Sequence, residues 1–183
     1  MADVYKKIRM KADFDIVRAA DSDAQEMCDM FFRHISLHNE YISHGELQMG
    51  VGQGKIQNGS LTAFPSPHGP ALWMKYILDK IRGGEKSAVF KASVAGEEMA
   101  GFCVVEITDD GAEPFGVVCD VLVNEECRCC GLGSALLDKG IAWLHAKGVS
   151  DIYLESGVNN KAAHEYFMRR GFVRISEIYK LGQ

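Results

Sequence analysis

Residues 116–133 read Gly-Val-Val-Cys-Asp-Val-Leu-Val-Asn-Glu-Glu-Cys-Arg-Cys-Cys-Gly-Leu-Gly, a β-branched run followed by a short polar loop and a glycine-spaced turn. Residues 134–148 then carry leucine and isoleucine near helical spacing and end at a glycine, which predicts a helix. Glycines at the start of a helix remove the Cβ atoms that would hold a ligand away from the backbone N–H groups of the first turn. Because these groups lie at the positive end of the helix dipole, the turn is a candidate phosphate site, to which Arg128 would add a positive charge.

Two motifs in this order resemble a known family. Residues 128–133, Arg-Cys-Cys-Gly-Leu-Gly, resemble the Arg/Gln-x-x-Gly-x-Gly/Ala signature of the GNAT superfamily of acyl-CoA-dependent N-acyltransferases. Residues 160–172, Asn-Lys-Ala-Ala-His-Glu-Tyr-Phe-Met-Arg-Arg-Gly-Phe, resemble a later helix and strand of that family, and residues 15–21 resemble its first strand and the turn into its first helix. The resemblance covers residues 13–180 and is weak between residues 40 and 85.

The resemblance implies an α/β fold with a mixed, mostly antiparallel central sheet flanked by helices. We expect a single N-acetyltransferase-like domain over residues 13–183, preceded by an N-terminal extension over residues 1–12. A length of 183 residues fits one well-buried domain and is short for two.

Local patterns predict the elements of this domain. Segment 43–70 is rich in Gly, Pro, Ser and His without sustained periodicity, so we expect a long loop, which is either a substrate lid, a partner surface or a plain insertion. The other elements follow from apolar periodicity and turn signals. They are strands at 14–18, 87–95, 99–107, 151–155 and 172–179, a hairpin turn at 96–98, and helices that open at Ser22 and Ala71.

The resemblance also implies acetyl-CoA as co-substrate and no metal. A backbone amide at or near Val123 would polarise the thioester carbonyl. The residues that we expect to bind the cofactor lie on the strand before the glycine turn, in the turn itself and on the later helix. They are Leu122, Val123, Arg128, Cys129, Cys130, Gly131, Leu132, Gly133, Ser134, Asn160 and Phe167.

The implied reaction is attack of an amine on the acyl thioester, with the coenzyme A thiolate leaving. A lysine-like amine of pKa ~10.4 must lose a proton, at about 4.6 kcal/mol at pH 7, whereas a thiol of pKa ~8.5 leaves as thiolate at about 2 kcal/mol. A general base therefore matters more than a general acid. The candidate bases are Asp120, on the strand before the turn, and Glu106, on the preceding strand. The alternative bases are the histidines His34, His38, His44 and His68.

The position of the catalytic acid departs from the family pattern. Counted from Asn160, the place of the usual tyrosine is taken by Phe167, and the tyrosine stands one residue earlier, at Tyr166. One residue on a helix turns a side chain by ~100°. Tyr166 is therefore a candidate acid or a core aromatic, and water could protonate the thiolate instead. The same departure leaves open a sensor or scaffold module that binds coenzyme A without catalysis.

Two nucleotide-binding motifs compete for the glycines. A Rossmann dinucleotide site also has a strand, Gly-x-Gly and a helix, with Glu155 as its later acidic residue. Leu136 at the third glycine position and the long loop before the glycine turn oppose it. Residues 50–56 hint at a phosphate loop, yet Met49 replaces its first glycine and Ile56 replaces the Ser/Thr that would bind magnesium.

Composition limits the partners. A net charge of -5, with only a short basic patch at residues 6–11, argues against nucleic acid. An apolar run of 18 residues and a signal-peptide core are both missing from the sequence, so we expect a cytoplasmic protein without membrane association. The six cysteines lack zinc spacing and are expected to be reduced, with Cys129 or Cys130 a candidate redox-sensitive thiol. The acceptor would be an amine of a small molecule or peptide, and the sequence does not identify it further. The sequence does not fix the oligomeric state either, and a homodimer is one option.

Overall fold

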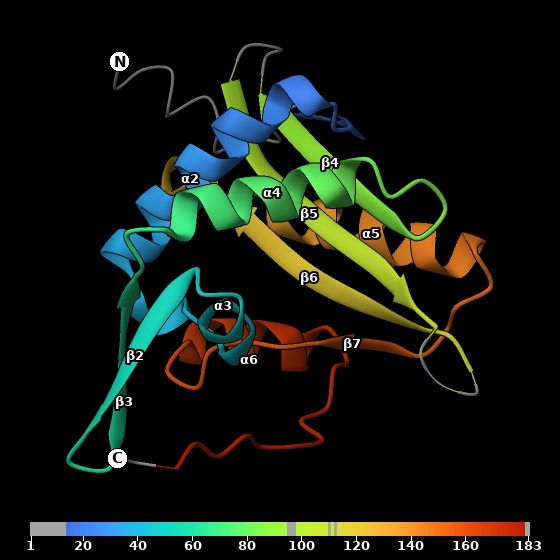
Figure 1. Cartoon of the computed structure of the whole chain (residues 1–183). Coiled ribbons are helices and arrows are strands. Elements are labelled where there is room, and N and C mark those ends of the chain that lie inside the picture. The colour runs from blue at the N-terminus through green and yellow to red at the C-terminus, as the bar shows by residue number, and fades with distance from the viewer. Residues whose placement is uncertain (1–13, 95–97, 110, 112, 182–183) are drawn as a thin grey trace. The chain divides into compact units, whose positions relative to one another are not determined.

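The computed structural model describes residues 14–94, 98–109, 111 and 113–181 (Figure 1). The N-terminal extension and most of the turn expected at 96–98 lie outside these residues. The chain divides into two compact units. Unit 1 comprises Met1–Met30 and Met74–Leu154, and unit 2 comprises Phe31–Trp73 and Glu155–Gln183. Two of the three boundaries fall within helices, α2 (Ala24–Leu37) and α4 (Gly69–Ile81), and the third follows Leu154.

Unit 1 contains a five-stranded sheet in the order β1-β4-β5-β6-β7. Its strands are β1 (Phe14–Arg18), β4 (Ser87–Val94), β5 (Glu98–Thr108), β6 (Phe115–Val123) and β7 (Ile152–Leu154). The first three pairings are antiparallel and only β6 with β7 is parallel. The expected mixed, mostly antiparallel sheet flanked by helices is confirmed.

The central strands β4 and β5 are covered on both faces, and this explains their sequences. Ala88, Val89 and Phe90 of β4 are buried, as is the whole run from Phe102 to Val105 of β5. A strand that is buried on both faces cannot alternate apolar and polar side chains, so it reads as a continuous apolar run.

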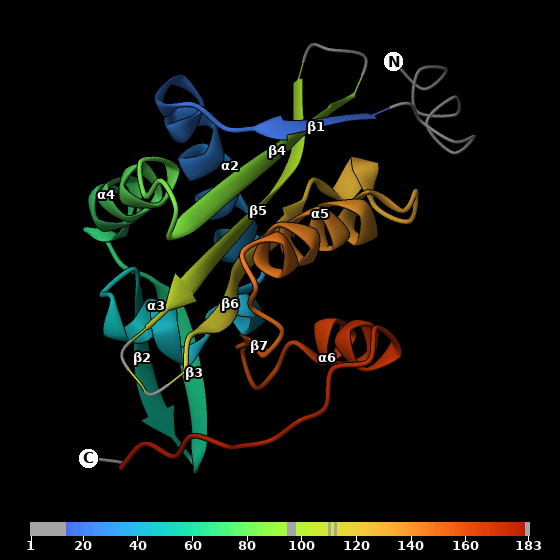
Figure 2. The same cartoon turned by 90° about the vertical axis from the view of Figure 1, so that its right-hand side faces the viewer.

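Helices cover opposite faces of this sheet in unit 1 (Figure 2). A Cβ added at Gly140, within α5 (Leu132–Ala146), would meet Val105 Cγ1 at 2.8 Å, so α5 approaches β5 closely on the face to which Val105 points. The next residue, Glu106, pairs instead with Lys80 of α4. Since neighbouring strand residues point to opposite faces, the Met74–Ile81 part of α4 lies across the sheet from α5.

A β-bulge changes the facing of side chains along β6. Val104 pairs with Asp120 while Val105 pairs with Val118, so Cys119 is an extra residue on β6. Before the bulge, a Cβ added at Gly116 would meet Leu144 Cδ1 of α5 at 2.8 Å. After it, Asp120 bonds to a side chain of α4. Strict alternation would place residues four apart on one face, so the bulge turns Asp120 towards α4.

Unit 2 contains a short helix and a hairpin in the segment 43–70, which was expected to be a long loop, so that expectation is wrong. The helix α3 (His44–Gln48) opens with a capping box between Ser43 and Glu46. The strands β2 (Gly52–Gln57) and β3 (Ser60–Pro65) are joined by Asn58 and Gly59, with φ of 52° and 74°. Positive φ at both residues is the geometry of a type I′ turn, for which Asn-Gly is the strongest signal.

The remaining elements are short. They are the 3₁₀ helices η1 (Asp21–Asp23), η2 (Asn39–Tyr41) and η3 (Glu125–Cys127) and the helix α6 (Lys161–Arg169). The strand expected over residues 172–179 is absent, since residues 172–181 have no regular secondary structure. Its apolar side chains are exposed, Val173 by 78% and Tyr179 by 84%. Alternating apolar residues form a strand only where a neighbouring strand supplies hydrogen bonds.

Gly101→Ala should destabilise unit 1 next to the glycine turn. An added Cβ at Gly101 would lie 2.5 Å from the carbonyl oxygen of Leu122, and backbone cannot yield as a flexible side chain can. We expect a loss of about 1–3 kcal/mol in the free energy of unfolding, measured by urea denaturation. The control is Gly111→Ala, also in unit 1, where an added Cβ would approach Glu113 O only at 4.0 Å. Equal stability of the two variants would contradict the close approach of β5 and β6.

Candidate functional site

The glycine turn is the junction between β6 and α5 in unit 1. β6 ends at Val123, the chain makes one turn of η3, and α5 begins with Gly131 as its N-cap. Gly131 has a φ of 89° and Cys129, a non-glycine residue, has a φ of 61°. These two left-handed residues allow the chain to reverse within a few positions, so that the loop meets the start of α5.

The start of α5 can be approached closely by a ligand. No described atom lies within 4 Å of a Cβ built at Gly131, and a Cβ at Gly133 would be in ordinary contact with Val123 Cγ2 at 3.5 Å. The first N–H groups of a helix have no acceptor within the helix and point outwards at its positive end. The geometry therefore suits a phosphate group that accepts from these N–H groups.

Arg128 supplies positive charge and also fixes the position of the loop between β6 and α5. Its Nε donates to the carbonyl oxygen of Val123 at 3.3 Å, and its Nη1 lies 3.6 Å from Glu125 Oε1. An ion pair this exposed contributes little stability. Arg128 thus fixes the loop against the end of β6, and part of its charge is offset by Glu125.

The cysteines of the loop are thiols that form no disulfide, and the same holds for the other three cysteines of the chain. Cys130 Sγ donates to the carbonyl oxygen of Cys127 at 2.8 Å, which closes the loop further. Elsewhere in unit 1, burial raises the pKa of the Cys119 thiol, and the carboxylates of Glu106 and Asp120 raise it further. Cys119 therefore keeps its proton at neutral pH.

Both candidate bases point to the α4 face of the sheet, and each has a partner there. Asp120 Oδ2 accepts a hydrogen bond from the Tyr76 hydroxyl at 2.7 Å. Burial raises the pKa of Tyr76 well above its ordinary value, and Asp120 and Cys119 raise it further, so the phenol keeps its proton and donates. Glu106 forms an ion pair with Lys80. Lys80 Nζ also lies 5.5 Å from the centre of the Tyr76 ring.

Tyr76 and Lys80 were missed from the sequence. They stand four residues apart on α4, so both side chains emerge on one helix face. The available signal was two side chains with polar ends on the core-facing side of a helix, where a polar group needs a partner.

The candidate residues of the later helix belong to unit 2. Asn160 is the N-cap of α6, and its Oδ1 accepts from the Ala163 N–H at 3.3 Å. Tyr166 and Phe167 are half-buried, and their ring centres lie 5.4 Å apart. The ring centre of Phe167 also lies 5.9 Å from that of Phe172. Asn160 therefore caps a helix, and Phe167 packs within an aromatic row.

The alternative bases also lie in unit 2. His34 and His38 cluster with Tyr41, while His44 Nδ1 lies 3.4 Å from Glu155 Oε2. His68 lines a cavity of about 510 Å³ together with Gln53, Ser66, Lys180 and other residues.

None of the helices in the described part of the chain has both the length and the apolar character needed to cross a bilayer.

Solved structures share this fold at low sequence identity. A tetramutant of the BH1408 protein from Bacillus halodurans aligns with a TM-score of 0.71 at 18% identity, over 92% of this chain and 99% of that one. A GCN5-related N-acetyltransferase from Ralstonia eutropha JMP134 aligns with a TM-score of 0.66 at 12% identity, over 92% and 98%. Glucosamine-6-phosphate N-acetyltransferase from Arabidopsis thaliana aligns with a TM-score of 0.57 at 16% identity, over 92% of this chain and 97% of that one. Likeness at these identities shows the fold alone.

Sequence comparison identifies the family. No curated protein gives a match. The acetyltransferase (GNAT) family profile matches residues 56–172, well over half of the chain, and this stretch includes the β6–α5 junction with Gly131 and all of α6. The chain therefore belongs to the GNAT family and is an acetyltransferase.

Proposed function

We propose that this enzyme transfers an acetyl group from acetyl-CoA to a primary amine of a small molecule or peptide by direct attack. GNAT acetyltransferases use acetyl-CoA as co-substrate. The observation that carries the proposal is the junction of β6 with α5, where Gly131 in the left-handed region exposes the start of a helix. The pyrophosphate of the cofactor would accept hydrogen bonds from the first N–H groups of α5, with Arg128 beside them.

The thioester would bind along the edge of β6 that follows the bulge. β7 pairs with β6 only through Gly116–Val118, and within the described residues this pairing does not continue along Cys119–Val123. A backbone N–H there, at Val123 or a neighbour, would donate to the thioester oxygen as charge develops on it. Leu122, Val123, Cys129, Cys130 and the first turn of α5 (Leu132, Gly133, Ser134) would then line the cofactor. The resemblance to the family adds Asn160 and Phe167 to the expected cofactor-binding residues.

We assign the general base to Asp120, with Glu106 as the alternative. The carboxylate of Asp120 accepts from a tyrosine that keeps its proton, so it retains a lone pair for the ammonium proton of the acceptor. The carboxylate of Glu106 is held in an ion pair with Lys80, so it is less available to an acceptor amine. The base acts directly or through one water.

Direct attack on the thioester needs no covalent acyl-enzyme intermediate. Cys119 is the thiol next to Asp120, and burial raises its pKa, so it is a poor nucleophile at neutral pH. After attack, the thiolate of coenzyme A leaves and takes a proton from Tyr166 or from water. Departure of a thiolate needs little help, so the displaced tyrosine is compatible with turnover.

The acceptor class is suggested by proteins of similar fold. One solved structure is of an aminoglycoside acetyltransferase from an uncultured soil metagenomic sample, and another is of glucosamine-6-phosphate N-acetyltransferase. Amines on sugars therefore belong among the first acceptors to test, beside peptides and polyamines. The free thiols fit the reducing cytoplasm that we propose for the enzyme, and a homodimer remains compatible with these features.

Gly131→Val should weaken acetyl-CoA binding by blocking access to the first turn of α5. The matched control is Gly148→Val at the other end of α5, where φ is also positive and no described atom lies within 4 Å of an added Cβ. Both variants should lose a similar 1–2 kcal/mol or so of stability from backbone strain. Only Gly131→Val should bind acetyl-CoA more weakly by calorimetry. Arg128→Ala should lower affinity about ten- to a hundredfold. Tight binding of NAD without binding of acetyl-CoA would overturn the cofactor assignment.

Asp120→Asn should lower turnover by ~10² to 10⁴ at pH 7, because the acceptor amine is then protonated and has no base. The loss should shrink as pH rises towards the pKa of the amine, since the free amine then forms unaided. Glu106→Gln is the control and should retain most of the activity. If both amide variants turn over normally at neutral pH, neither carboxylate is the base and a histidine or bound water replaces it.

Tyr166→Phe should lower turnover by less than ~10-fold, below the usual contribution of a general acid. Phe167→Tyr should leave acetyl-CoA binding unchanged and raise turnover modestly, if this position once held the acid. Steady-state rates with calorimetry on the same samples separate the two effects. A Tyr166→Phe variant with normal binding and a thousandfold lower turnover would show that Tyr166 does protonate the leaving sulfur.

A further inference from the structure

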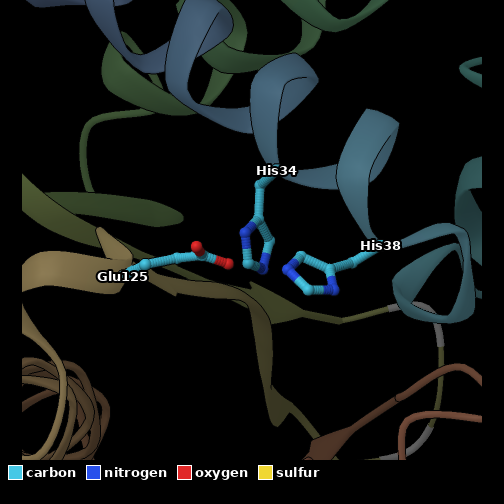
Figure 3. Close-up of side chains that lie close together, drawn as sticks. All are labelled: His34, His38 and Glu125. Carbon is cyan, nitrogen blue, oxygen red and sulfur yellow. The ribbon is translucent and has the colours of Figure 1, made fainter.

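Two histidines stand one helical turn apart at the end of α2, within unit 2 (Figure 3). The N–H of His38 donates to the carbonyl oxygen of His34 at 2.9 Å, so the helical spacing continues through His38. Their ring centres lie 5.2 Å apart, and their ligand nitrogens lie within 4.8 Å of one another. Glu125, labelled in the same view, belongs to unit 1.

Neighbouring residues of unit 2 hold both rings in place. The ring of Tyr41 stacks on His34 at 4.6 Å with an interplanar angle of 16°, and lies 4.8 Å from His38. Glu40 Oε1 lies 3.1 Å from His38 Nδ1. At this distance the carboxylate oxygen of Glu40 accepts the Nδ1–H of His38. That hydrogen bond places the lone pair of His38 on Nε2.

We propose that His34 and His38 form a binding site for a divalent transition-metal ion, with water completing its coordination. Imidazole pairs suit Zn²⁺, Cu²⁺ and Ni²⁺. Two nitrogens on one zinc ion lie about 3.3 Å apart for a tetrahedral site with bonds near 2.05 Å, so a small rotation of either side chain closes the pair. Glu40 orients a ligating histidine through its other ring nitrogen, the usual arrangement around protein-bound metals.

The metal would connect the last turn of α2 to the segment that follows it. His34 lies in α2, whereas Glu40 and Tyr41 lie in η2. Only the last three residues of α2, His38 and Asn39 lie between His34 and Glu40. Binding to the folded protein alone stabilises that form in proportion to metal concentration. The proposed metal site and the proposed acetyl-CoA site share no residues and differ in their chemistry. The metal proposal therefore does not depend on the proposed transfer reaction.

Proton NMR of the whole chain provides the test, since the sequence has only six histidines. Titration with paramagnetic Ni²⁺ should first broaden the imidazole signals of His34 and His38. Calorimetry with Zn²⁺ should give one site, which Glu40→Gln weakens about tenfold and which His34→Gln or His38→Gln weakens further, to the level of a single exposed imidazole. The matched controls His44→Gln and His164→Gln, both in unit 2, should bind as the wild type does.

Three results would overturn the proposal. The first is selective broadening of other histidines. The second is loss of zinc binding in Cys129→Ser or Cys130→Ser with binding retained in His34→Gln, which would assign the metal to thiolates. The third is absence of binding by the wild type, measured with protein whose near-UV circular dichroism shows a native fold.

Discussion

The extra residue in β6 is the constraint on which the candidate site depends. A strand that alternates without interruption would send Gly116 and Asp120 to one face, against α5. Insertion of Cys119 opposite the Val104–Val105 step instead sends Asp120 to the face of α4, where Tyr76 binds it. Pairing with β7 also stops at Val118, directly before the bulge. The bulge thus turns the Asp120 carboxylate towards the α4 face of the sheet and coincides with the end of the pairing between β6 and β7.

The glycine turn then puts the proposed cofactor site at the end of the same strand. Val123 is the last residue of β6 and accepts a hydrogen bond from Arg128, and a Cβ added at Gly133 would lie 3.5 Å from the Cγ2 atom of Val123. On the opposite side of β6, the approach of Gly101 to Leu122 leaves no space for a side chain. The end of β6 is therefore fixed from both sides, which is what a site that positions a thioester requires.

Features set by nearby residues could be read from the sequence. The β6–α5 junction is one such feature, because strand, loop and helix are contiguous and Gly131 must adopt a positive φ. The Asn58-Gly59 turn carried an equally local signal, yet the Gly, Pro, Ser and His content of the surrounding segment and its lack of periodicity favoured a loop. The segment after α6 alternates apolar side chains as a strand does, but the pattern cannot supply the neighbouring strand that it needs.

Features that join distant residues could not be read in this way. The Tyr76–Asp120 bond spans 44 positions and the Lys80–Glu106 pair spans 26, so no local period reveals them. The direction of Asp120 depends on a bulge that the sequence of β6 does not mark. His34 and His38 have helical spacing, but from the sequence alone they indicated only alternative bases, because two histidines without further ligands at zinc-finger spacing do not predict a metal site.

Acetyl-CoA turnover by the wild-type protein tests acetyl transfer to an amine most directly. The enzyme would be supplied with acetyl-CoA and, separately, amino sugars, polyamines and peptides, with release of the coenzyme A thiol followed over time and the products identified by mass spectrometry. We expect thiol release that depends on one class of amine, with one acetyl group gained by that amine. Saturable binding of acetyl-CoA with no amine-dependent thiol release across all classes would contradict transfer to an amine.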